Sequence, residues 1–67
     1  MTFDEAQAEH SRLCKFYGVT AGQDRDYMPT GVNYYKEGKF IFNLKPHDVV
    51  LITPLLKESL AEMFDND

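Results

Sequence analysis

The chain has 67 residues, of which 43% are hydrophobic and 13% aromatic, and its formal net charge at pH 7 is −4. This composition is typical of a folded chain, and the acidic balance argues mildly against non-specific binding to nucleic acid. One domain with a small core is expected over residues 1–67. The single cysteine excludes an internal disulfide. Because no apolar run is long enough for a membrane span either, we predict a cytoplasmic protein without membrane contact.

The N-terminal segment is predicted to form a helix over residues 3–17. Thr2 and Glu5 have the spacing of a capping box, in which each side chain accepts a hydrogen bond from the other residue's backbone N–H. Gly18 follows as the left-handed residue that ends many helices. Phe16 points away from the apolar stripe of this helix, so we expect it to be exposed and available to a partner.

The segment from Gly18 to Gly31 is predicted to be a long irregular loop, because its composition is typical of turns. Its charged residues are expected to be solvated. At about fourteen residues the loop exceeds most connections in compact domains, and loops of that length are often functional or mobile.

The next segment, residues 32–44, is predicted to form a two-stranded antiparallel hairpin. Two runs rich in β-forming residues flank Glu37-Gly38, which has the sequence of a two-residue turn. An isolated hairpin is marginally stable, so one side is expected to pack on the helices and the other to be covered by another molecule. One side then carries two facing pairs, Tyr35 with Phe40 and Asn33 with Phe42, and the other side carries Val32, Tyr34 and Ile41.

The C-terminal segment from Leu44 to Phe64 is the densest run of large aliphatic residues, and its spacing predicts a helix. Pro46 suits the first helical position. Pro54 removes one intrahelical hydrogen bond, so we predict a helix kinked or broken near this residue. In an alternative that stays open, residues 49–52 form a short buried strand and a helix begins at Pro54. The core-facing residues of the full helix would be Val49, Ile52, Leu56, Leu60 and Met63.

Two residues with reactive side chains share one face of the first helix, because His10 and Cys14 are four positions apart. The pair could supply two metal ligands or a nucleophile with its base. A zinc site needs further ligands, which His47 and Asp48 supply only in principle, and no motif provides an oxyanion hole. We therefore expect neither a metal site nor a catalytic site, and we interpret Cys14 as a buried packing residue.

The leading hypothesis is a non-enzymatic protein–protein interaction module without a cofactor, either a homodimer or a small subunit or inhibitor of another protein. It depends on the excess of apolar surface for so short a chain. The size and acidity also suit an accessory protein of a phage or mobile element. The alternative is nucleic-acid binding through the aromatic hairpin, which Lys36 and Lys39 flank. The residues expected to contact the protein partner are Phe16, Tyr34, Ile41, Leu51 and Leu55.

Overall fold

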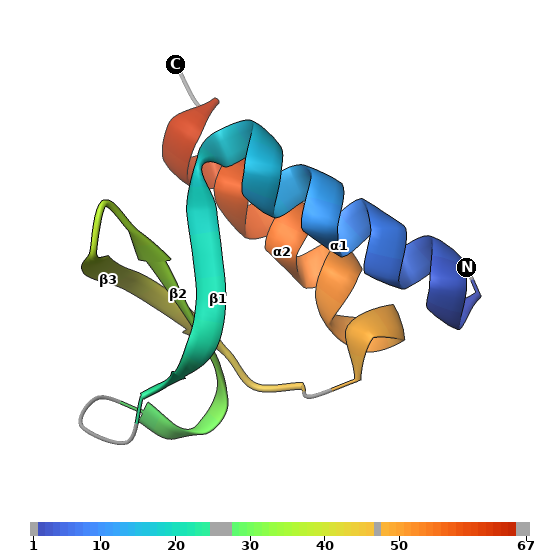
Figure 1. Ribbon diagram of the computed structural model, residues 1–67, viewed down its shortest axis with the longest axis horizontal. Helices are drawn as coiled ribbons and strands as arrows, with labels where there is room; N and C mark the ends of the chain where they lie inside the picture. The colour runs from blue at the N-terminus through green and yellow to red at the C-terminus, as the bar shows by residue number, and fades with distance from the viewer. Residues whose placement is uncertain (1, 25–27, 47, 66–67) are drawn as a thin grey trace.

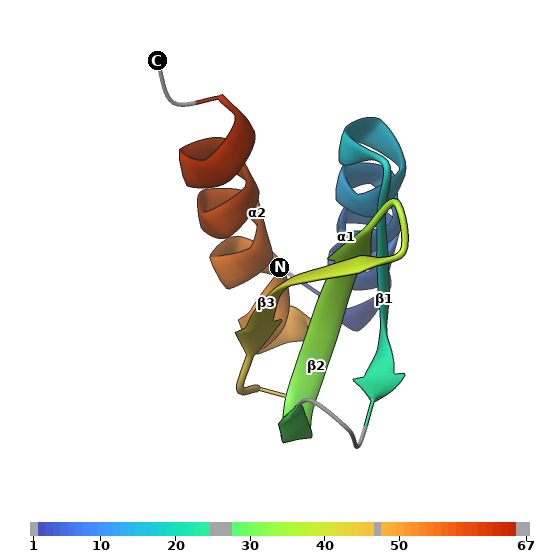
Figure 2. The same cartoon turned by 90° about the vertical axis from the view of Figure 1, so that its left-hand side faces the viewer.

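The protein is an α+β fold in which two helices lie on one face of a three-stranded antiparallel sheet (Figures 1 and 2). The computed structural model describes residues 2–24, 28–46 and 48–65, and over residues 23–24 and 28–30 it describes the backbone alone. The elements in chain order are α1 (Phe3–Tyr17), β1 (Val19–Asp24), β2 (Met28–Lys36), β3 (Lys39–Leu44) and α2 (Val49–Phe64). The strand order in the sheet is β1-β2-β3.

Helix α1 begins and ends where its sequence predicts. The side chain of Thr2 accepts a hydrogen bond from the backbone N–H of Glu5, and the Glu5 carboxylate accepts one from Thr2. These contacts satisfy backbone donors that the first turn leaves without partners. At the other end Gly18 has φ of 68°, the left-handed conformation, and turns the chain directly into β1. The predicted capping box and glycine stop are confirmed.

The prediction of a long loop from Gly18 to Gly31 was wrong, because most of the described residues in this segment form strands. Strand β1 pairs with β2, which begins at Met28 rather than at Val32. Only Val19 and Thr20 of β1 are good β-formers, and the four residues that follow are not, so local preferences did not reveal the strand. Pairing with the strong β-forming residues at the end of β2 stabilises the strand, because strand formation depends on the neighbouring strand as well as on local preference.

The hairpin of β2 and β3 has the predicted turn but a different register. Glu37 and Gly38 form the turn with φ of 55° and 78°, so both residues are left-handed, as a tight two-residue hairpin requires. Tyr35 faces Phe40 as predicted. Asn33 was expected opposite Phe42, but it faces Asn43, because the register shifts by one residue between Tyr34 and Tyr35. An extra residue in β3 accounts for this shift, and Phe42 moves to the opposite face of the sheet.

Helix α2 is continuous from Val49 to Phe64 with Pro54 inside it. Of the two forms predicted, a helix kinked near Pro54 or one broken there, the broken form was therefore wrong, and so was the strand alternative for residues 49–52. Asp48 caps the helix by accepting a hydrogen bond from the N–H of Val50, and Pro46 precedes the helix. The side chain of Pro54 is exposed, so its ring faces solvent and not the core. Thr53 is 1% exposed, and its hydroxyl lies 2.7 Å from the carbonyl oxygen of Val49.

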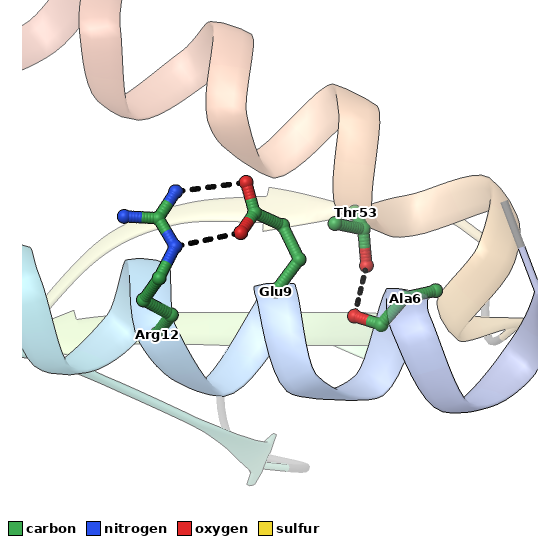
Figure 3. Close-up of polar contacts among 4 residues, drawn as sticks. All are labelled: Ala6, Glu9, Arg12 and Thr53. Atoms are coloured by element: carbon green, nitrogen blue, oxygen red, sulfur yellow. Dashed lines mark hydrogen bonds and ion pairs between the residues drawn. The ribbon is translucent and has the colours of Figure 1, made fainter.

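The two helices run in the same direction, with their N-terminal ends joined by Thr53 and their C-terminal ends by aromatic rings. The Thr53 hydroxyl lies 3.1 Å from the carbonyl oxygen of Ala6 (Figure 3). The ring centroids of Tyr17 and Phe64 are 5.9 Å apart. The core between the helices and the sheet contains Leu13, Val19, Tyr34, Ile52, Leu56 and Leu60.

Tyr34 lies in this core with an exposed fraction of 0%, which corrects the expectation that its side of the hairpin needs another molecule as a cover. The helices cover that side themselves. No helix in the described part of the chain is long and apolar enough to cross a membrane.

Candidate functional site

A part-buried hydrogen bond joins His10 of α1 to Tyr34 of β2. Nε2 of His10 lies 2.8 Å from the Tyr34 hydroxyl, and Nδ1 lies 4.0 Å from Sγ of Cys14. Helix α1 places His10 and Cys14 one turn apart on the side that meets the sheet, and β2 supplies Tyr34. The sequence predicted the first pair by spacing, but Tyr34 is brought to it only by the fold.

Burial sets the protonation state of this cluster. It lowers the pKa of His10 and raises the pKa of Cys14 and of Tyr34, because each environment disfavours the charged form. At neutral pH the imidazole, thiol and phenol are therefore all uncharged. A thiol with a raised pKa is a weaker nucleophile at neutral pH than an ordinary cysteine, because less of it is thiolate.

A metal site would need more ligands than this cluster contains. Among the described residues no three His, Cys, Asp or Glu side chains gather around a common point. Asp48, considered from the sequence, instead caps α2 through its side chain, and His47 lies outside the described residues.

An open groove runs between α1 and β1, with a volume of about 670 Å³. His10 and Cys14 lie on its helix side, and Val19 and Ala21 lie on its strand side. Both elements face the viewer in Figure 1. This groove was not predicted from the sequence, because β1 was expected to be loop and a groove beside a strand cannot be inferred without the strand.

Two of the expected contact residues lie together on an exposed flank of α2. Leu51 is 60% and Leu55 41% exposed, and they are one helical turn apart. Leu55 lies about 200° around the helix from Thr53, which contacts α1, so this flank points away from α1. Figure 2 shows β3 on the same side of the molecule as α2. We refer to Leu51 and Leu55 as the leucine flank.

Phe16 lies on a separate surface, at the C-terminal ends of the two helices. Its side chain is 73% exposed, and its ring packs edge-on against Tyr17 with centroids 5.0 Å apart. The Tyr17 hydroxyl donates a hydrogen bond to Asp65, which raises the pKa of the tyrosine. Lys36 lies over the Phe64 ring at 5.1 Å and donates to the Tyr17 carbonyl. The structure therefore does not bring Phe16 together with the leucine flank.

The remaining expected contact residues belong to the hairpin. Tyr34 is buried and so has no surface to offer a partner. Ile41 is half-buried and packs against the core. Phe42 also packs against the core, which leaves the aromatic residues of the hairpin divided between the two faces of the sheet. A continuous row of rings for stacking bases is therefore not formed on one face.

A scan of protein-family models and searches of curated proteins and of solved structures found no significant match to this chain.

Proposed function

We propose that the chain is a non-enzymatic protein–protein interaction module that forms a homodimer through the leucine flank of α2. The observation that supports the proposal is the exposure of two leucines, one turn apart, on a helix whose other leucines are buried. Burying an exposed leucine stabilises a contact by about 1.5–3 kcal/mol at most. Two leucines from each copy would form the apolar centre of the interface, and the surrounding polar residues would form its rim.

A second copy is the occupant we propose for this flank. In a two-fold contact the same surface serves both copies, so four leucines meet at the centre. A standard interface covers about 800 Å² of each partner. The total accessible area of the chain is 4738 Å², so the contact would use a minor part of the surface.

The charges on α2 favour an antiparallel arrangement of the two copies of this helix. Glu58 and Glu62 follow the leucine flank along the same side of α2. A parallel pair would place these carboxylates beside their own copies, which repel each other. In an antiparallel pair they approach the positive N-terminal end of the partner's α2 instead.

The test compares charge substitutions at matched exposed residues. Leu51→Glu and Leu55→Glu each place a charge in a desolvated contact, and we expect both variants to be folded monomers. Phe3→Glu is the control, because Phe3 has the same exposed fraction as Leu51, 60%, but lies on α1. Circular dichroism verifies folding, and light scattering at several concentrations gives the mass.

The proposal is supported if the wild type and Phe3→Glu have the mass of a dimer while Leu51→Glu and Leu55→Glu have the mass of a monomer. If the wild type is a monomer up to millimolar concentration, the homodimer is wrong. If both leucine variants remain dimers, the interface lies elsewhere on the molecule.

A further inference from the structure

One edge of the sheet lies open beside the groove. β1 pairs with β2 on one side, and on its other side no strand among the described residues pairs with it. Helix α1 contacts β1 and forms the second wall of the groove. An open strand edge next to a helix is the arrangement in which proteins add an extended peptide to a sheet.

The backbone groups of β1 point the right way for such an addition. Residues that flank a two-residue hairpin turn form a hydrogen-bonded pair, which here is Lys36 with Lys39. Tyr35, the residue before Lys36 in β2, therefore directs its backbone groups to the other side, towards Thr20 of β1. The N–H and C=O groups of Val19 and Ala21 consequently point away from β2, into the open edge.

The groove combines a small apolar floor with basic groups. Val19 and Ala21 are two positions apart on β1, so their side chains lie on the same face of the strand. Lys15 and Arg12 line the groove from α1, although the chain as a whole carries a net charge of −4. Arg12 is paired with Glu9 at 2.7 Å (Figure 3), so Lys15 contributes most of the local positive charge.

We propose that the groove between α1 and β1 binds an extended acidic peptide segment of another protein, which adds to β1 as a fourth strand. The backbone groups of Val19 and Ala21 would hold the peptide in register. Its acidic side chains would lie on the helix side of the sheet, the face that carries Val19 and Ala21, and would meet Lys15 of α1, while the alternate side chains would lie on the opposite face. This binding site is separate from the leucine flank, so it does not depend on self-association.

The single cysteine makes the proposal measurable, because Cys14 lines the groove and any thiol reagent reports on this site alone. The probe is a six-residue peptide of alternating glutamate and valine, capped at both ends. We expect it to slow the reaction of Cys14 with a disulfide reagent in proportion to the bound fraction. The analogous lysine–valine peptide should protect much less, because like charges then meet at Lys15.

Three comparisons separate strand addition from non-specific binding. A glutamate–valine peptide with alternate backbone nitrogens methylated keeps its charge but loses donors, so we expect it to lose protection. Lys15→Glu should weaken binding about tenfold, whereas Lys39→Glu, the same charge change at the hairpin, should change it little. The monomeric Leu51→Glu variant should show the same protection as the wild type.

Absence of protection at millimolar peptide would overturn the proposal. Equal protection by the methylated peptide would also overturn it, because binding would then not use the strand edge. Loss of protection in Leu51→Glu would show that the peptide needs the dimer, which would contradict an independent site.

Discussion

Gly31 is the residue at which the structure allows the sharpest stability prediction. Its φ is +80°, and a Cβ built on it would lie 2.4 Å from the carbonyl oxygen of Leu44. That oxygen belongs to the backbone of the last residue of β3, which pairs with Val32. Gly31→Ala therefore requires either the backbone of β2 or that of β3 to move.

The cost of Gly31→Ala has two parts. A left-handed conformation costs an alanine about 1–2 kcal/mol. Displacing the carbonyl of Leu44 adds strain, so we expect the free energy of unfolding to fall by at least about 2 kcal/mol in total. For a domain of this size the whole free energy of unfolding is about 3–10 kcal/mol, so the loss is large.

Two other glycines provide matched controls for Gly31. Gly38 has φ of +78° and no atom within 4 Å of the position that a Cβ would take, so Gly38→Ala measures the conformational cost alone. Gly22 has neither a positive φ nor a neighbour within 4 Å, so Gly22→Ala should be neutral or stabilising by up to about 1 kcal/mol. Urea unfolding followed by circular dichroism gives all three values. If Gly31→Ala is no less stable than Gly38→Ala, the close approach to Leu44 is wrong.

Three further predictions concern the helices. Thr53→Val keeps the shape of the side chain but removes the hydroxyl near Ala6, and we expect urea unfolding to show a loss of about 1 kcal/mol. The pKa of His10 is lowered in the folded state, so the unfolded chain binds the proton more tightly. Stability should therefore fall as the pH drops below 6.5, and His10→Gln should reduce this dependence, as unfolding at several pH values would show. Without any ligand, Cys14 should react with a thiol reagent more slowly than in the urea-unfolded chain, since burial raises its pKa; equal rates would contradict its position.

Local signals in the sequence predicted the parts of the fold that local interactions determine. Thr2 with Glu5 and the glycine at position 18 set the ends of α1, and Glu37-Gly38 set the hairpin turn. Each of these depends on residues within one turn of each other, so no knowledge of the rest of the chain is needed.

The sequence could not reveal features that depend on distant partners. Most residues of β1 are weak β-formers, and the strand depends on its pairing with β2. The extra residue in β3 turns Phe42 to the helix side, and no turn or propensity signal marks it. Pro54 predicts a kink or a break, but α2 continues through it, with Ile52, Thr53 and Leu56 buried around it. Tertiary contacts outweigh local preferences at each of these positions.

The same distinction applies to the candidate sites. Helical spacing placed Leu51 and Leu55 away from the buried stripe, and both are exposed. The groove beside β1 could not be predicted, because it needs both a strand that the sequence conceals and the helix that packs on it.

The most direct test of self-association is an isotope-filtered nuclear Overhauser experiment on a mixture of two samples. One sample carries ¹³C-labelled leucine methyl groups, and the other is unlabelled. We expect contacts between the labelled methyl groups of Leu51 and Leu55 and protons of the unlabelled copy, while the buried Leu56 and Leu60 show none. Intermolecular contacts that arise only from other leucines would contradict an interface at the leucine flank. The absence of any intermolecular contact would also contradict it, if the mass at that concentration is twice the 7.7 kDa of the chain.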